Sequence, residues 1–173
     1  MSLITERLIR FDLTCDDTAI VGVKSINLPS ISEKTVDVDG SGIMGTYQTP
    51  VLGQLDNMEV SMDLTHVDPA QAVILQAPIV HNVIAYIAAQ VRDNETDEIS
   101  VQKWRITMRL RPKSVNEGSL QTDNDLNGTT TFACSQYKMY INGELTCDVE
   151  PLNSIYLWNG TDYYADVRTA LDL

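Results

Sequence analysis

The chain has 173 residues, with 24 Asp and Glu against 12 Lys and Arg and a formal net charge of −12. This length fits one domain, and a hydrophobic content of 43% supplies enough apolar surface for a core, which excludes general disorder. The acidic excess argues against wrapping around nucleic acid, because phosphate contacts are made by Lys and Arg. We expect a single domain over residues 1–173, with long loops at about 39–50 and 113–128.

We expect neither a targeting signal nor a membrane segment in this chain. Residues 1–10 lack the basic, apolar and small-residue stretches of a signal peptide, so we expect synthesis in a cytoplasm. The most apolar region, residues 73–91, is interrupted by Gln76, Pro78 and His81, which argues against a membrane anchor. The cysteines are three in number, without paired spacing, so free thiols are expected in place of disulfides or a zinc site.

Alternation of apolar and polar residues with a period of two dominates the first half of the chain. Early strands are expected at 20–27 and 33–39, separated by Leu28-Pro29. Residues 58–65 show the clearest alternation and predict a half-buried strand. Its buried face carries Met58, Val60, Met62 and Leu64, and its outer face carries Glu59, Ser61 and Asp63.

A helix is expected at 68–76, because Asp68 supplies a capping carboxylate, Pro69 suits the first turn, and Pro78 ends the segment. After it, residues 82–92 and 103–111 predict a long hairpin joined by the polar stretch 93–98. The outer face of the second strand is basic and carries Lys103, Arg105, Arg109 and Arg111. This face is either a solvated surface or a contact for an acidic surface on a neighbouring copy.

The C-terminal part predicts further hairpins. Residues 129–141 and 144–149 flank Asn142-Gly143, a pair that favours a type I′ turn because both residues take positive φ. Asn159-Gly160 is expected to form another turn, and Thr161 or Asp162 to cap a short helix that runs through Leu171. The chain as a whole therefore reads as mainly β and antiparallel.

Catalytic and metal chemistry is not expected. His66 and His81 have no second ligand at helical or hairpin spacing, and no nucleophile elbow is present. We therefore assign no catalytic residue, no metal and no cofactor.

Several segments, each weakly specific alone, follow one another in an order that resembles a known family. They are 22–29 (GVKSINLP), 42–45 (GIMG), 52–59 (LGQLDNME), the hairpin 90–109, 137–144 (YKMYINGE), 148–153 (DVEPLN) and the ending 159–173. Together they resemble the major tail tube protein of contractile-tailed bacteriophages, a family shared with the tube proteins of R-type pyocins. Ser41 and Asp172 stand where the family pattern has glycine.

The resemblance implies an antiparallel β-sandwich or rolled barrel with one flanking α-helix and a short C-terminal helix. It also implies hexameric rings that stack into the hollow inner tube of a contractile tail, and no enzymatic activity. The implied partners are further copies of the chain, the tail sheath protein, a baseplate or initiator, and a tape measure protein. The implied location is the virion tail, where DNA transits the lumen without specific binding.

Within that architecture we expect Glu59, Ser61 and Asp63 to face the lumen, with Asp37 and Asp39 as a second group. An acidic wall would repel DNA and not retain it. The loop carrying Gly40, Gly42, Met44 and Gly45 is the expected assembly loop. Two alternatives stay open: a ring protein like those of type VI secretion, and, from a different class, an acidic all-β ligand-binding module.

Overall fold

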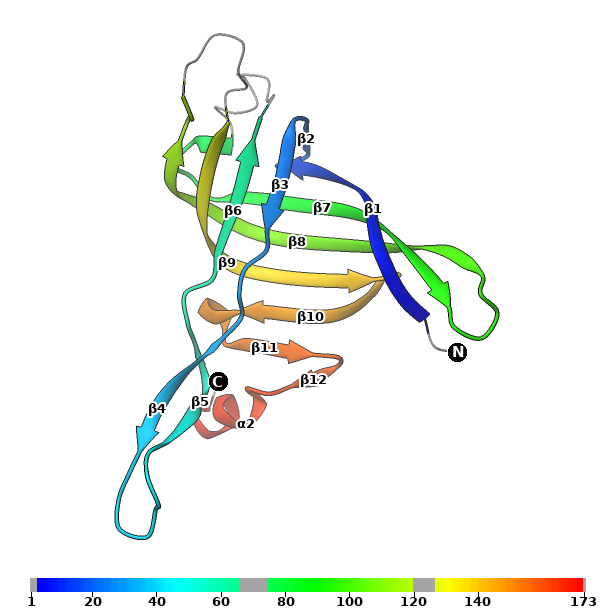
Figure 1. Cartoon of the computed structure of the whole chain (residues 1–173). Coiled ribbons are helices and arrows are strands. Elements are labelled where there is room, and N and C mark those ends of the chain that lie inside the picture. The colour runs from blue at the N-terminus through cyan, green and yellow to red at the C-terminus, as the bar shows by residue number, and fades with distance from the viewer. Residues whose placement is uncertain (1–2, 66–74, 120–126, 173) are drawn as a thin grey trace.

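The computed structural model describes residues 3–65, 75–119 and 127–172. This part of the chain is mainly β, as the sequence predicts (Figure 1). Its strands are β1 (Leu3–Cys15), β2 (Thr18–Ile20), β3 (Val23–Asn27), β4 (Glu33–Val38), β5 (Tyr47–Leu55), β6 (Glu59–Leu64), β7 (His81–Asp93), β8 (Ile99–Asn116), β9 (Gly128–Ile141), β10 (Glu144–Glu150), β11 (Ile155–Trp158) and β12 (Thr161–Asp162). A 3-10 turn, η1 (Pro151–Asn153), and a short helix, α2 (Ala165–Ala170), complete it.

The strands form one large antiparallel sheet that is folded over on itself. Its main order is β12-β11-β10-β9-β8-β7-β1-β2, while β6 pairs with the beginning of β9 and β3 pairs with β6. Strand β9 changes neighbours along its length: residues 128–133 pair with β6 and residues 137–141 pair with β10. Strand β8 accompanies β9 through both parts, with a register shift between Arg109 and Leu110 near the bend (Figure 1).

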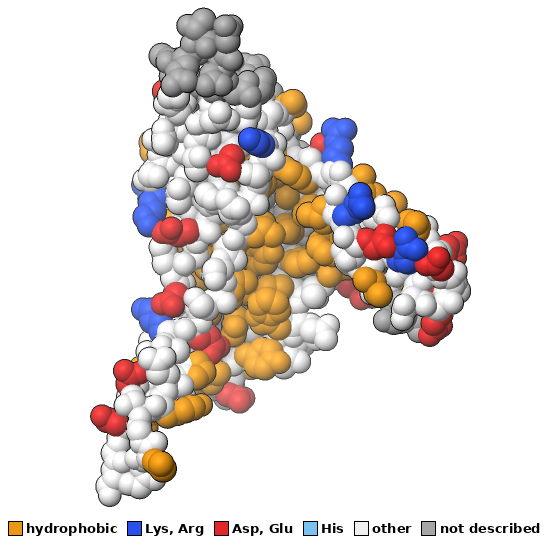
Figure 2. All heavy atoms as spheres, in the orientation of Figure 1, with side chains coloured by type: hydrophobic (Ala, Val, Ile, Leu, Met, Phe, Trp, Pro, Cys, Tyr) orange, Lys and Arg blue, Asp and Glu red, His pale blue; other side chains and the backbone are white. Residues whose placement is uncertain are grey.

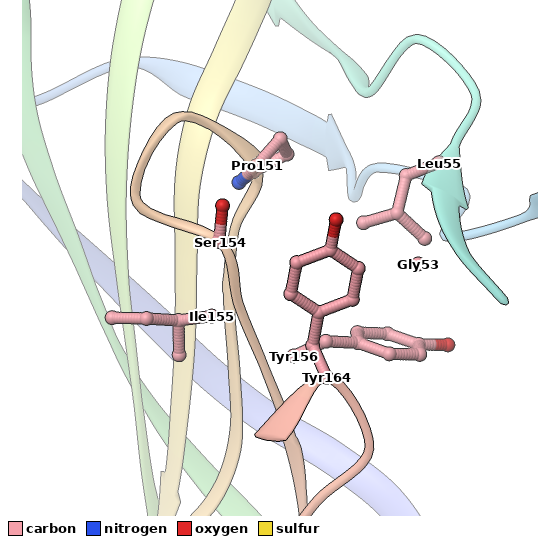
Figure 3. A pocket seen from close by; sticks show the side chains of 7 residues that line it. All are labelled: Gly53, Leu55, Pro151, Ser154, Ile155, Tyr156 and Tyr164. Atoms are coloured by element: carbon pink, nitrogen blue, oxygen red, sulfur yellow. The ribbon is translucent and has the colours of Figure 1, made fainter. Parts of the chain in front are cut away.

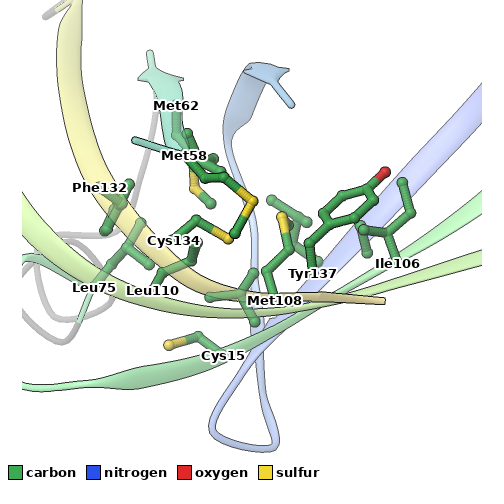
Figure 4. Packing of buried hydrophobic residues seen from close by; sticks show 14 of the residues in the cluster. Cys15, Met58, Met62, Leu75, Ile106, Met108, Leu110, Phe132, Cys134 and Tyr137 are labelled. Carbon is green, nitrogen blue, oxygen red and sulfur yellow. The ribbon is translucent and has the colours of Figure 1, made fainter. Parts of the chain in front are cut away.

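The core lies on the inner side of this bend. Val60 and Met62 of β6, Leu110 of β8 and Phe132 of β9 have no exposed surface, and they meet Leu75 there (Figure 4). Each alternates with an outward polar neighbour along its strand, which is the arrangement that the period-two pattern predicts. Cys15, Cys134 and Cys147 are free and buried.

Most of the predicted elements are confirmed. The hairpin β7–β8 turns across residues 94–98, and β6 lies where residues 58–65 predict it. Asn142 and Gly143 have φ of 51° and 91° in the turn between β9 and β10, and Asn159 and Gly160 likewise take positive φ between β11 and β12. Residues at these turns adopt the left-handed region that a two-residue hairpin loop requires.

Three expectations are wrong in their boundaries. The loop expected at 39–50 is shorter, because Tyr47–Pro50 pairs with β4 inside strand β5. The loop expected at 113–128 also starts later, because Ser114, Val115 and Asn116 pair with β9. Thr161 and Asp162 belong to β12 and pair with Trp158 and Leu157, so helix α2 starts only at Ala165, with Tyr164 before it and no side-chain cap.

Strand β1 is not predicted by alternation, because its residues 3–10 are exposed on both faces and two register shifts interrupt its pairing with β7. The expected helix at 68–76 lies mostly outside the described residues, of which Leu75 and Gln76 are helical. His66 lies outside them as well. Within the described ranges, no helix has the length and apolar character needed to cross a bilayer.

Candidate functional site

One surface of the folded sheet carries most of the expected lumen residues. Glu59, Ser61 and Asp63 alternate with the buried residues of β6, so their side chains share the face turned away from the core. The neighbouring strands add polar partners on this face: the Ser25 hydroxyl donates to Asp63 Oδ2 at 2.5 Å, and the Asn27 amide donates to Ser61 Oγ at 2.8 Å. We call this face of β3, β6 and the paired parts of β8 and β9 the polar face.

The two carboxylates of the polar face are held by neighbours. Thr129 donates to Asp63 Oδ1 at 2.9 Å, and the hydroxyls of Ser25 and Thr129 lower the pKa of Asp63. Glu59 forms an ion pair with Lys113. The polar face is therefore a mixture of hydroxyls, carboxylates and lysine, and less acidic than β6 alone predicts.

The strands of the polar face end in two open edges. Strand β8 pairs with β7 only as far as Leu110, so residues 111–116 have β9 on one side and no described strand on the other. Strand β3 has β6 on one side and likewise no described strand on its outer side. The backbone groups of these edges can pair with a strand of another chain.

The expected basic face is assembled by β8. Lys103, Arg105, Arg109 and Arg111 are all exposed and point away from the core. The Arg105 guanidinium lies 4.2 Å from the centre of the Tyr140 ring, a cation–π contact. Within the described ranges, none of the four basic side chains has an acidic partner.

Strands β4 and β5 form a two-stranded hairpin that projects from the body (Figure 1). Val36, Val38 and Tyr47 share one face of this hairpin and are exposed, while Asp37 and Gln48 share the other. The expected assembly residues Gly40, Gly42, Met44 and Gly45 lie at its tip, where Met44 is fully exposed. Asp37 and Asp39 are thus not on the polar face, since they belong to the hairpin.

The base of the hairpin is fixed against the C-terminal segment. Gly53 of β5 has φ of +71°, and a Cβ added there would lie 1.8 Å from Cε2 of Tyr164. The Tyr164 ring lies next to Gly53, and Leu55 and Tyr156 line the same small hollow of about 40 Å³ (Figure 3). A hollow of this size is far below the several hundred Å³ of a ligand pocket. The contact therefore serves to position the hairpin.

The inside of the bend is an apolar hollow that is only partly filled. Figure 2 shows hydrophobic side chains gathered between the part that carries β3 and β6 and the arm that carries β1. Phe11, Ile87, Met139 and Tyr156 are partly buried members of this surface. Contiguous apolar surface that stays partly exposed is a common feature of interaction sites.

A comparison with protein families identifies the family of this chain. A model of the family named phage tail tube protein FII matches residues 5–171. The chain belongs to this family. The tail tube protein of Escherichia phage P2 is 24% identical over 154 residues, which is 87% of each chain. The major tail tube protein of Serratia phage KSP20 is 23% identical over 172 residues, which is 98% of each chain.

A solved structure supports the fold. The sheath/tube terminator of the extracellular contractile injection system PVC, in the extended state, has a TM-score of 0.53 and 13% sequence identity, and the match covers 79% of this chain and 97% of that one. The resemblance and the fold class predicted from the sequence are confirmed. As a tail tube protein of contractile systems, the chain is a structural component of the virion tail and not an enzyme.

Proposed function

We propose that six copies of this tail tube protein close into a ring, that rings stack into the hollow inner tube of a contractile tail, and that DNA passes through the tube during ejection. The observation that carries the proposal is the pair of open edges on either side of the polar face. Strand directions alternate along β3, β6, β9 and β8. The β8 edge of one copy would therefore meet β3 of the next copy antiparallel, and the alternation would continue around the ring with no edge left open.

In such a ring the polar face would line the lumen. Its carboxylates, Glu59 and Asp63, and its hydroxyls give DNA phosphates little to bind, and Lys113 is already paired with Glu59. Arg111, opposite Ala133, adds one cation on this side of β8. Because retention of DNA depends on Lys and Arg that displace counterions, a wall of this kind allows passage.

Stacking requires a second contact that does not close on itself. The hairpin β4–β5 suits this role, because an isolated two-stranded hairpin is at best marginally stable in water and its apolar face is exposed. We assign its docking site to the apolar hollow of a neighbouring copy, where Phe11, Ile87 and Met139 would become covered. Docking would then bury the apolar face of the hairpin and the apolar hollow together.

The basic face of β8, through Lys103, Arg105 and Arg109, is the proposed site for an acidic surface on a neighbouring copy, whereas Arg111 lies beside the polar face. The tail sheath protein is a further proposed partner; the solved relative is itself named a sheath/tube terminator. A baseplate or initiator and a tape measure protein are the remaining proposed partners, at the end of the tube and in its lumen. Production in the host cytoplasm is proposed because the chain belongs to a family of phage tail proteins.

Negative-stain electron microscopy over a concentration series tests the ring and the tube. Hollow rings or tubes with a central channel are the expected particles. Isolated rings that never stack into tubes would favour the type VI secretion-like alternative. Monomers at every concentration, even with tail ends added as initiators, would contradict the proposal.

Disulfide cross-linking tests which edges meet. Lys24→Cys on β3 combined with Val115→Cys on β8 places an exposed thiol on each open edge, whereas the native cysteines are buried. Under oxidation we expect a ladder of covalent species that ends at six chains. Each single variant is the control, since a lone thiol cannot extend a ladder beyond two chains. A double variant that assembles but gives no ladder would show that other edges form the ring.

A further inference from the structure

A cluster of three polar side chains lies away from the polar face, the basic face and the hairpin. Cys15 ends β1, Asp16 begins the turn into β2, and His81 begins β7. Cys15 and His81 are completely buried, while the Asp16 side chain is 41% exposed. The Cys15 sulfur, a carboxylate oxygen of Asp16 and a ring nitrogen of His81 all lie within 4.8 Å of one another.

The hydrogen bonds of His81 leave one ring nitrogen with an unusual neighbour. Nε2 lies 3.0 Å from the carbonyl oxygen of Ala77, which can only accept, so Nε2 carries the hydrogen. Nδ1 lies 2.9 Å from Oδ2 of Asp16. In a neutral imidazole the lone pair of Nδ1 would then face a carboxylate oxygen, so the contact is favourable when a proton or a metal ion is shared by the two groups.

Asp16 is held in place for such a role by the backbone. The N–H of Asn82 donates to Oδ1 at 3.0 Å, which leaves Oδ2 turned toward Nδ1 of His81 and toward the Cys15 sulfur, 3.7 Å away. Asp16 and Asp17 have φ of 47° and 65°, and the Asp16 N–H donates to the carbonyl oxygen of Asn82 in β7 at 3.0 Å.

We propose that Cys15, Asp16 and His81 bind a divalent metal ion of the zinc type, with solvent in the fourth position. Sulfur, nitrogen and oxygen ligands are those that Zn²⁺ takes in proteins, and tetrahedral bond lengths place such ligand atoms roughly 3.3–3.7 Å apart. The Cys15–Asp16 separation of 3.7 Å fits, and the three ligand atoms lie within 4.8 Å of one another. The Asp16–His81 separation of 2.9 Å has to widen, through rotation of the partly exposed Asp16 side chain.

The surroundings match those of a metal centre as well. A metal-binding His commonly donates its second N–H to a carbonyl, as Nε2 does to Ala77, and ligating carboxylates accept further hydrogen bonds, as Asp16 does from Asn82. Binding of the ion by the Cys15 sulfur would displace the thiol proton to solvent. The ion would tie the β1–β2 turn to the start of β7.

Titration of the metal-stripped protein with Co²⁺ under non-thiol reductant tests the proposal. We expect visible d–d bands and a near-ultraviolet thiolate-to-cobalt band that saturate near one ion per chain, and we expect Zn²⁺ to bleach them and to raise Tm by mass action. Absence of both bands at about tenfold excess, with Tm unchanged by Zn²⁺, would overturn it and leave a proton between Asp16 and His81.

Variants locate the ion. Cys15→Ser should lose the near-ultraviolet band, and Asp16→Asn should weaken binding while leaving that band visible at high Co²⁺. Cys134→Ser is the matched control, because it removes another buried thiol from outside the cluster and should leave the spectrum unchanged. A band that persists in Cys15→Ser or disappears in Cys134→Ser would overturn the assignment. The titration of the unmodified protein decides the matter if a variant fails to fold.

Discussion

Strands β6 and β4 have similar alternating sequences, but the apolar residues of β6 are buried and those of β4 are exposed. In β6, Val60 and Met62 are completely buried against β8 and β9. In β4, Val36 and Val38 are 52% and 37% exposed, because β5 is the one described strand that pairs with β4. Alternation therefore predicts a strand with one apolar face, but it does not say whether that face is covered within the subunit or by a neighbour. This difference separates the residues that stabilise the fold from those that we assign to assembly.

The largest expected effect is loss of a core side chain. Phe132→Ala removes a fully buried ring from β9, and we expect the free energy of unfolding to fall by about 3–5 kcal/mol, since a cavity adds to the lost apolar burial. Urea denaturation followed by circular dichroism measures it. Met44→Ala, at the exposed tip of the hairpin, is the control, with an expected change within about 0.5 kcal/mol. Equal losses would mean that the hairpin packs as a core element in the free subunit.

The contact between hairpin and body gives the next effect. Gly53→Ala places a side chain at φ of +71° and pushes its Cβ into the Tyr164 ring, so we expect a loss of about 1–3 kcal/mol in thermal melts. Adding Tyr164→Ala should recover the part due to the clash and leave the part due to the backbone. If the double variant is no more stable than Gly53→Ala alone, the contact with the Tyr164 ring does not cause the loss of stability.

A smaller effect concerns a buried ionic cluster on β9 and β10. Lys138 lies 3.0 Å from Asp148 and 2.7 Å from Glu150, and Asn153 donates to Glu150 at 2.6 Å. Burial alone would raise the pKa of Glu150, but the hydrogen bonds from Lys138, Asn153 and Gln136 outweigh it and lower that pKa. Because the folded state has the lower pKa, this stabilisation is present above the usual value of 4.5 and is lost as pH falls through the folded value.

We therefore expect Glu150→Gln to lower stability at neutral pH and to flatten the decline in Tm between about pH 5 and 3. Other carboxylates with lowered pKa, such as Asp162, retain part of the decline. Glu144→Gln, at an exposed position of β10, is the control and should leave the slope unchanged. The same slope in Glu150→Gln would assign the acid sensitivity to other groups.

The sequence predicted what local rules determine. Asn142-Gly143 specified its turn because few other residue pairs adopt positive φ at both positions, and β6 and β8 were recognisable because each covers a core on one face. The bend of the sheet was not predictable, because β9 changes its partner from β6 to β10 along its length. The pairing with β6 joins residues more than 60 positions apart in the sequence, such as Ser61 and Thr131. Cys15, Asp16 and His81 were missed as a group for the same reason.

The smallest effect on stability is expected from the basic face. Arg105→Glu with Arg109→Glu changes two exposed side chains that have no acidic partner among the described residues, so the free energy of unfolding should change by less than about 1 kcal/mol. Assembly should suffer far more, because the −12 subunit loses its proposed contact with acidic surfaces of neighbouring copies. The control, Arg105→Lys with Arg109→Lys, keeps both positive charges and should still form tubes.

Salt dependence distinguishes a charge contact from a general loss of packing. If the basic face meets acid across an interface, the concentration at which the unmodified protein forms tubes should rise with salt, as screening shortens the Debye length from ~10 Å at 0.1 M to ~3 Å at 1 M. The glutamate variant should require a high concentration at every salt level. Tubes of the glutamate variant that form as readily as those of the unmodified protein would show that the basic face is a solvated surface, and the apolar contacts of hairpin and hollow would then carry assembly alone.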